Sequence, residues 1–278
     1  MLKQISLLIL CAAAIVWFAT PVQACTSAVV SGKVTPDGRP LLWKNRDTDF
    51  MRNHIDYVKG EKYNFIAVVN SANAYLKEAW MGTNSSGFAL MNTQSYNLVD
   101  VKGDEERGAA NGRVIYRALE VCATVEDFCY FLDTISKPSD IEANFGVIDA
   151  QGGAAMFEVD YHKYVMYDAN NPKDAPYGYI ARTNFSFAGK VNEGAGYVRY
   201  MEADQVLMKA SATGSITPQF IFNDLSRSFR NRMLDIDLRS GAYNRPQASG
   251  WFVDQDFIPR SSTSCSVVVQ GVKPGEKA

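Results

Sequence analysis

Cys25 is the residue whose surroundings in the sequence most clearly indicate chemistry. The segment before it, residues 1–24, has the pattern of a secretory signal peptide: Lys3 is its only charge, an apolar core follows, and Val22 and Ala24 are the small residues that leader peptidases prefer. Cleavage after Ala24 would leave Cys25 as the first residue. It would then carry a thiol on its side chain and a free α-amine on its main chain. The pattern therefore predicts an exported protein, periplasmic or extracellular, that begins with a cysteine.

A thiol beside a free α-amine is a nucleophile that carries its own base. An α-amine titrates near ~7.7–8, against ~10.4 for lysine, so it can take and return a proton near neutral pH. The thiol is a good nucleophile once its proton has left. The alternative, a Cys/His pair, depends on His54 or His162, and neither context marks a base, so both are predicted to be ordinary surface or packed histidines. Because no Cys or His pairs occur at ligand spacing, we predict no metal and no cofactor.

Composition limits the class of protein. The sequence has 278 residues with 28 basic and 30 acidic side chains, and residues 25–278 are long enough for one large domain. Their net charge of about −3 argues against nucleic acid or an anionic membrane as the main partner. The apolar run of the leader is too short to span a bilayer stably. Homo-oligomerisation is left open.

The remaining cysteines indicate no disulfide scaffold. Cys122, Cys129 and Cys265 are predicted to be buried small hydrophobes, as free cysteines usually are, although export leaves a disulfide open.

The elements that must position Cys25 begin with a β-hairpin. Residues 27–32 form a strand of small residues, Thr35-Pro36-Asp37-Gly38 is a turn, and residues 40–45 form the return strand. This hairpin delivers Arg46 and Asp49 beside the start of the first strand, so both could lie near Cys25.

The rest of the chain alternates strands and helices. Further strands are predicted at 64–70, 79–82, 88–93, 144–149, 155–159, 164–167, 179–183 and 265–270. Helices are predicted at 111–122, from Thr124 up to Pro138, at 198–210, and from Phe220 to about Arg230 after the cap Thr217-Pro218. This order predicts an α+β fold in which helices are layered on stacked antiparallel sheets.

The motifs together resemble a known superfamily, the N-terminal nucleophile (Ntn) hydrolases that act on linear amides. Cys25-Thr26-Ser27, the hairpin and Arg46-Asp47-Thr48-Asp49-Phe50 resemble the start of those whose first residue is cysteine, with Arg-x-x-Asp before an aromatic residue. This group includes penicillin V acylase, choloylglycine (bile salt) hydrolase, acid-ceramidase-like amidases and the isopenicillin N acyltransferase group. Gly82 to Phe88 resembles the Gly-x-Asn-x-x-Gly-Leu turn of that group. Ala181 to Asn184 resembles its Thr-Asn motif, and Tyr197 to Tyr200 resembles the helix start that carries a late arginine.

The resemblance implies a four-layer αββα sandwich and an amidase that acts through a thioester. In it the Cys25 thiolate attacks an amide carbonyl, Asp49 holds the ammonium form of the α-amine, and Arg46 favours the thiolate. Asn92 and Asn184 donate to the oxyanion. Arg199 is the late arginine at the site. The substrate is a small N-acyl amide.

The departures from the family pattern favour one branch of the family, and alternatives to amide hydrolysis remain open. Phe185-Ser186 stands where serine-proline often follows the Thr-Asn motif, and the segment from Asn184 to Arg199 is short, which points to the acyltransferase-like branch. Acyl transfer to an amine is therefore an alternative to hydrolysis. Residues 22–25 also resemble a loose lipobox, so a lipoprotein with a binding role is a second alternative. Bile-acid amides, N-acyl amino acids, phenoxyacetyl amides and lipid amides all remain open as substrates.

Overall fold

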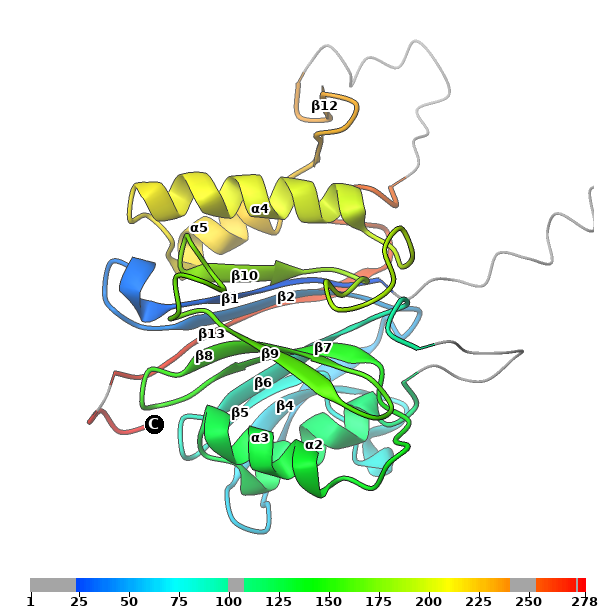
Figure 1. Ribbon diagram of the computed structural model, residues 1–278, viewed down its shortest axis with the longest axis vertical. Coiled ribbons are helices and arrows are strands. Elements are labelled where there is room, and N and C mark those ends of the chain that lie inside the picture. The colour runs from blue at the N-terminus through cyan, green and yellow to red at the C-terminus, as the bar shows by residue number, and fades with distance from the viewer. Residues whose placement is uncertain (1–23, 100–107, 241–253, 274) are drawn as a thin grey trace, which may run out of the picture.

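Four layers make up the fold: helices, a small sheet, a large sheet and helices again (Figure 1). The computed structural model describes residues 24–99, 108–240, 254–273 and 275–278. Neighbouring strands in both sheets run antiparallel. The predicted α+β sandwich of two stacked antiparallel sheets flanked by helices is confirmed.

The smaller sheet has four strands in the order β10-β1-β2-β13. Its strands are β1 (Thr26–Val30), β2 (Leu41–Asp47), β10 (Tyr179–Arg182) and β13 (Thr263–Gln270). The predicted hairpin is present, since β1 pairs with β2 from Thr26↔Asn45 to Val30↔Leu41. On the other side of β2, Cys265 of β13 lies opposite Arg46. Segments from the two ends of the chain therefore meet on β2.

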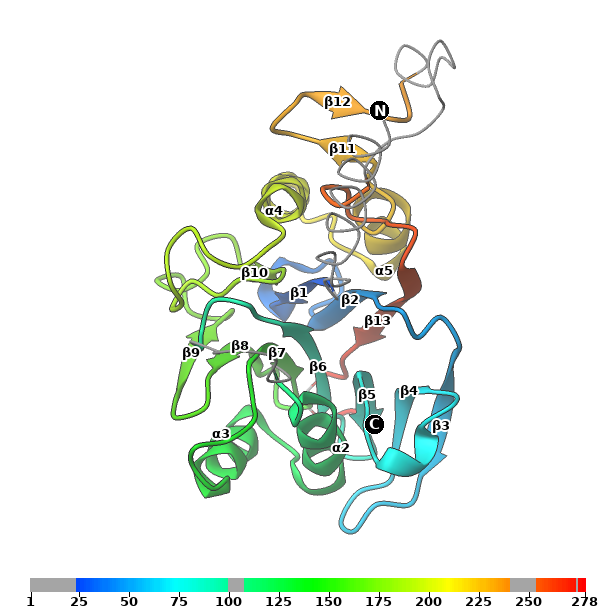
Figure 2. The same ribbon diagram turned by 90° about the vertical axis from the view of Figure 1, so that its right-hand side faces the viewer.

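The larger sheet has seven strands in sequence order, β3 to β9. They are β3 (Asn53–Val58), β4 (Phe65–Asn70), β5 (Met81–Asn84), β6 (Ala89–Gln94), β7 (Ala143–Ile148), β8 (Ala154–Val159) and β9 (Tyr164–Asp168). Figure 2 shows β3 and β4 at one edge of this sheet, beyond the strand β13 that ends the smaller sheet.

The helices lie on the outer faces of the two sheets. The large sheet is covered by α2 (Asn111–Val121) and α3 (Val125–Thr134), and the small sheet by α4 (Tyr197–Ala212), α5 (Pro218–Phe220) and the π-helical turn η3 (Ile221–Leu225). Short 3-10 turns, η1 (Gly32–Val34) and η2 (Ala74–Leu76), lie in loops, and β11 (Arg230–Asn231) pairs with β12 (Ile236–Asp237) in a small hairpin.

Strand alternation explains why the central strands are apolar on both faces. In β1, Ala28 and Val30 pack under α4, while Val29 between them faces the large sheet. In β2, Trp43 packs under the helices and Leu42 faces the large sheet. A polar side chain placed on the inter-sheet face of these strands is therefore buried between the two sheets.

The sequence predicted most elements to within about two residues, with several exceptions. The strands β3, β11 and β12 were missed, and α3 ends at Thr134 rather than near Pro138. The helix predicted from Phe220 to about Arg230 is wrong in its second half, because the helical turns end at Leu225. There the hydroxyls of Ser226 and Ser228 bond to Phe222 O and to Glu202, which competes with helix continuation.

Residues 1–23, which carry most of the predicted signal peptide, lie outside the described residues. In the part of the chain that is described, no helix combines the length and the apolarity that a membrane crossing needs.

Candidate active site

Cys25 lies immediately before β1, at one end of the small sheet, and is 8% exposed. Its main-chain N is here the amide of the Ala24–Cys25 bond and donates to Asn184 Oδ1 at 3.0 Å. Its Sγ lies 4.0 Å from the main-chain oxygen of Asp47, at the end of β2. The same nitrogen would be the α-amine in a chain cut after Ala24.

Arg199, in the first turn of α4, holds the main chain at Cys25. Its Nη1 donates to Cys25 O at 2.7 Å and to Thr26 Oγ1 at 2.8 Å, and its Nη2 donates to Asn184 Oδ1 at 2.7 Å. The side chain is 1% exposed, and this burial lowers the pKa of Arg199 to about 10. The structure therefore brings together Cys25, Asn184 and Arg199, three of the residues that the sequence predicted for the site.

Asn184 follows β10 and contacts Cys25 through its carbonyl oxygen. That oxygen accepts from both Cys25 N and Arg199, while Asn184 Nδ2 donates to Gln94 O at 2.9 Å. The sequence had assigned this amide nitrogen to the oxyanion. That role stays a prediction; in this structure, with the Ala24–Cys25 bond intact, the Asn184 carbonyl oxygen holds the Cys25 main chain.

Two cations lie beside Cys25 on the inter-sheet face of β2, Arg46 as predicted and also Lys44. Arg46 is 4% exposed; its Nη2 donates to Asn70 Oδ1 at 2.7 Å, and its guanidinium lies over the Trp80 ring at 4.9 Å. Lys44 is 2% exposed. Burial lowers the pKa of both groups, and a charge on Cys25 opposes that shift.

Asn92, on β6, reaches the site through Lys44 rather than through Cys25. Lys44 Nζ donates to Asn92 Oδ1 at 3.0 Å and to Trp80 O at 3.1 Å. The predicted role of Asn92 at the oxyanion therefore stays a prediction, while its contact with the buried lysine is established.

The predicted partner of the α-amine, Asp49, is not among the groups that surround Cys25. β2 ends at Asp47, and the Asp49 side chain beyond it is exposed. The buried acid is Asp47, 1% exposed, whose Oδ1 accepts from Thr263 Oγ1 at 2.6 Å and whose Oδ2 lies 3.6 Å from Arg260 Nη1. Burial raises the pKa of Asp47 to about 6.

The histidines and the other cysteines lie in different environments. His54 and His162 are both exposed, and His54 Nδ1 bonds to Ser71 Oγ at 3.1 Å. Cys25, Cys122, Cys129 and Cys265 are all free thiols. Burial raises the pKa of Cys122 to about 12, which makes it a poor nucleophile.

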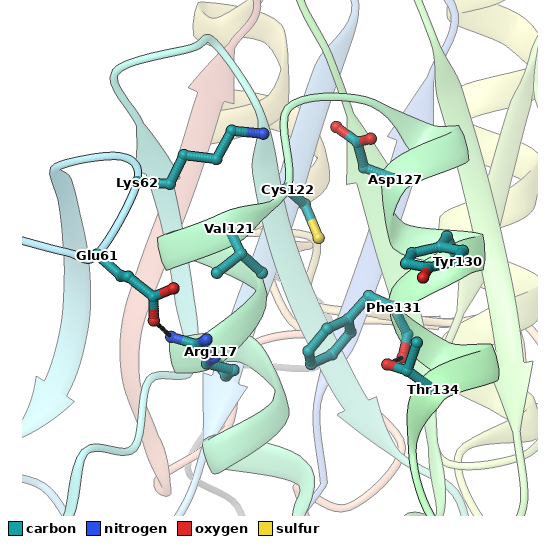
Figure 3. A pocket seen from close by; sticks show the side chains of 9 residues that line it. All are labelled: Glu61, Lys62, Arg117, Val121, Cys122, Asp127, Tyr130, Phe131 and Thr134. Carbon is teal, nitrogen blue, oxygen red and sulfur yellow. Dashed lines mark hydrogen bonds and ion pairs between the residues drawn. The ribbon is translucent and has the colours of Figure 1, made fainter.

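A pocket away from Cys25 lies on the outer side of the large sheet, around the facing helices α2 and α3 (Figure 3). Val121 and Cys122 at the end of α2, Tyr130 of α3, and the loop residue Lys62 all line it. The large sheet separates it from the small sheet that carries Cys25, so it belongs to a different face of the molecule (Figure 1).

No cluster of three or more His, Cys, Asp or Glu side chains suited to a metal ion occurs within the described ranges. The groups around Cys25 are a thiol, amides, cations and one carboxylate, which suit acyl chemistry on a cysteine.

The residues that sequence reasoning missed are Lys44, Asp47 and Trp80. Lys44 stands in the run Leu41-Leu42-Trp43-Lys44, and a lysine inside a strand that is otherwise apolar signals a buried charge. No comparable signal marks Trp80, because its role depends on how β5 lies against β2.

The sandwich, with a buried cysteine at the end of the small sheet where β1 begins, is that of the N-terminal nucleophile superfamily of linear-amide C–N hydrolases. Within it, the sequence model of the acyl-coenzyme A:6-aminopenicillanic acid acyl-transferase family matches residues 34–212. The chain belongs to that family. No curated protein matches the sequence.

Among solved structures, the chain is similar to an orthologue of N-acylethanolamine-hydrolyzing acid amidase from Caenorhabditis elegans, with 15% identity over 72% of this chain and 89% of that one, at a TM-score of 0.48. It is also similar to a mutant conjugated bile acid hydrolase from Clostridium perfringens, with 16% identity, 72% and 74% coverage and a TM-score of 0.44. Penicillin V acylase from Agrobacterium tumefaciens matches with 15% identity, 70% and 75% coverage and a TM-score of 0.38.

Proposed function

We propose that this protein is an exported amidase that hydrolyses the C–N bond of a linear N-acyl amide through Cys25. The observation that supports this most directly is the buried Cys25 itself. Its main chain is held on both sides, by Asn184 on N and by Arg199 on O, and its thiol lies on the sheet face that carries Lys44 and Arg46. Such fixation orients a nucleophile and is of little use to a cysteine that only packs.

The reaction uses the α-amine freed by removal of residues 1–24. The amine takes the Cys25 Sγ proton, and the thiolate attacks the amide carbonyl carbon to give a tetrahedral oxyanion. The C–N bond then breaks, the ammonium returns the proton to the leaving amine, and a thioester remains. Water, deprotonated by the same amine, attacks the thioester; the acid leaves, and Sγ regains its proton.

In this mechanism Asp47 replaces Asp49 as the carboxylate that favours the ammonium. Asp47 is buried at the end of β2, its main-chain oxygen lies near Sγ, and its Oδ2 accepts no hydrogen bond from the described residues. An ammonium on Cys25 N would add to the positive charges of Arg260 and Arg199, which already favour the ionised form of this carboxylate.

The positive charges of Lys44 and Arg46 favour the thiolate and the oxyanion that follows it. In comparable sites, loss of one oxyanion donor raises the barrier by about 2.7–4 kcal/mol. Lys44 also fixes Asn92 by donating to its Oδ1.

Acyl transfer is the second candidate, because the family whose model matches the chain is described as an acyl-transferase. The two functions share every step up to the thioester and differ in whether water or an amine attacks it. Turnover in the presence and absence of acceptor amines distinguishes them.

The proposal is tested by extending the chain by one residue before Cys25. The thiol remains, but the nitrogen becomes an amide that cannot accept a proton, so turnover should fall by about 10²–10⁴-fold while the protein still folds. As the matched control, replacing both His54 and His162 should leave most of the activity. Full amide turnover by the extended protein, or loss of turnover in the histidine variant, would contradict the mechanism.

Intact mass of the exported protein checks the start of the mature chain. The expected mass is that of residues 25–278 with an unmodified amine. A mass higher by two or three acyl chains would instead establish a lipoprotein and refute the enzyme.

A further inference from the structure

A pocket whose polar lining residues carry hydrogen-bond donors lies between β2 and β13 of the small sheet and β4 and β5 of the large sheet. Lys44 and Arg46 of β2 line it with Trp80, which precedes β5, and Cys265 of β13. Val68, Met81 and Val267 complete its apolar walls. No carboxylate lines it, so the two cations face it without a negative side chain among the lining residues.

Two donors of this pocket lack acceptors in the described part of the chain. Arg46 Nη1 and Trp80 Nε1 are both buried and make no hydrogen bond. The second terminal nitrogen of Arg46, Nη2, donates to Asn70 Oδ1, which is neutral. Burying a hydrogen-bond donor without an acceptor costs free energy, and burying a cation without a counter-ion costs more. Because Arg46 Nη1 and Trp80 Nε1 both lack an acceptor near Cys25, they indicate a binding site for a ligand that accepts hydrogen bonds.

The pocket is not the place where the oxyanion forms. Cys25 does not line it, whereas Cys265 does. Cys265 lies opposite Arg46 on β13, on the far side of β2 from β1, and neighbouring strands are ~4.8 Å apart. A group in the pocket therefore lies roughly 5–10 Å from the strand that begins at Cys25, a few bonds away from the reacting carbonyl.

We propose that this pocket binds a carboxylate of the substrate, so that the preferred substrates are N-acyl amides that carry a negative charge near the scissile bond. Arg46 Nη1 and Trp80 Nε1 donate to the carboxylate oxygens, and the charges of Arg46 and Lys44 compensate its own charge. The pocket has no room even for a water molecule as it stands, so its side-chain walls must part to admit the group. That the bound anion is part of an amide substrate rests on the proposed function. That the pocket binds an anion rests on the pocket alone.

The carboxylate can belong to either half of the amide. In an N-acyl amino acid it lies on the amine half, and in an amide of a dicarboxylic acid it lies on the acyl half. Matched probe pairs separate these sources: N-decanoylglycine against N-decanoylethanolamine, and N-glutaryl-p-nitroanilide against N-valeryl-p-nitroanilide.

Binding to the Cys25→Ala protein, measured by calorimetry, tests the pocket without turnover. In at least one pair the charged probe should bind about 10- to 100-fold more tightly than its neutral partner, as charge-assisted hydrogen bonds predict. Trp80→Phe, which removes Nε1 and keeps an aromatic ring, and Arg46→Lys, which keeps the charge and removes the fork, should each reduce this ratio several-fold. Arg117→Lys, in the pocket of Figure 3, is the matched control and should leave the ratio as it was.

Equal binding of both members in both pairs would overturn the inference, and so would a ratio that Trp80→Phe and Arg46→Lys do not change. Neither result bears on the proposed amidase, because turnover of any neutral amide that requires Cys25 would still establish that function. Conversely, selective binding of the charged probes without hydrolysis of any amide would support the anion-binding pocket and contradict the proposed amidase activity.

Discussion

At the scale of single residues, the site depends on which acids and bases are buried. Arg46 and Lys44 are two residues apart in β2, so their side chains share the face between the sheets. Asp47 is one residue further and faces the helix side, where Thr263 and Arg260 contact it. The start of β1 is therefore flanked by Lys44 and Arg46 on one side, and by Asp47 with the cations Arg199 and Arg260 on the other.

The titration of Asp47 gives a prediction for the protein that carries one extra residue before Cys25. Burial raises the pKa of Asp47 to about 6, so the folded protein holds this proton more tightly than the unfolded chain does. The resulting stabilisation is complete below the unfolded pKa of ~3.9 and is lost as pH rises through about 6. Relative to the parent, Asp47→Asn should gain about 3 kcal/mol in free energy of unfolding between pH ~4 and ~7.

Urea unfolding at several pH values measures this difference. Asp49→Asn is the control, and because the Asp49 side chain is exposed, its difference from the parent should stay flat. A pH-independent difference for Asp47→Asn would show that this carboxyl does not titrate in the window.

The sequence predicted Cys25, Arg46, Asn184 and Arg199 at the site because motif and strand order are local or semi-local signals. It assigned the acid to Asp49 from the Arg-x-x-Asp pattern. That pattern does not show which acid is buried, because burial depends on where β2 ends, and that is set by pairing with β13 from the far end of the chain. Tertiary pairing overrides local pattern here.

At the scale of elements, strands with a continuous apolar run were easier to predict than β3, whose apolar side chains are exposed. β4 to β8 carry apolar runs and were found. β3 was missed although Ile55 and Tyr57 alternate with His54 and Asp56, which is a period-two signal. Both apolar residues are exposed on β3, so the segment lacks the continuous apolar run of a buried strand.

The first turn of α4 is the element that joins the helix layer to Cys25. Gly196 precedes it in a left-handed conformation, φ 87°, and a Cβ there would lie 2.4 Å from Arg199 Nη2. The glycine therefore leaves room for the arginine to turn back towards Cys25.

Arg199→Lys tests that connection. Lysine keeps the charge but cannot reach Cys25 O, Thr26 Oγ1 and Asn184 Oδ1 together, so kcat should fall about 10²-fold through misplacement of the nucleophile, with a smaller change in KM. Arg227→Lys, at an exposed arginine, is the control. Steady-state kinetics and the melting temperature separate the outcomes, since an equal loss of activity and of folded protein would indicate a structural role only.

At the scale of the whole molecule, a buried ion pair ties the two sheets together. Glu158 belongs to β8 of the large sheet and Arg182 to β10 of the small one; Arg182 Nε lies 2.7 Å from Glu158 Oε1, and both side chains are almost fully buried. Glu158 also accepts from the main-chain nitrogens of Phe187 and Ala188 at 2.9 and 2.7 Å. The pair therefore fixes the loop after β10 that contains Asn184.

Removing one partner of this pair should destabilise the protein more than any exposed pair can. Arg182→Met leaves Glu158 charged and buried, which should cost about 3–5 kcal/mol in free energy of unfolding. The exposed pair Arg230–Asp235 is the matched control, and Arg230→Met should cost at most about 1 kcal/mol. Adding Glu158→Gln to Arg182→Met should recover part of the loss, because the uncompensated charge is gone while the side chain still accepts from the loop. Denaturant unfolding of the parent and the three variants measures these energies. An Arg182→Met cost no larger than that of Arg230→Met would show that the sheets are held together without the pair.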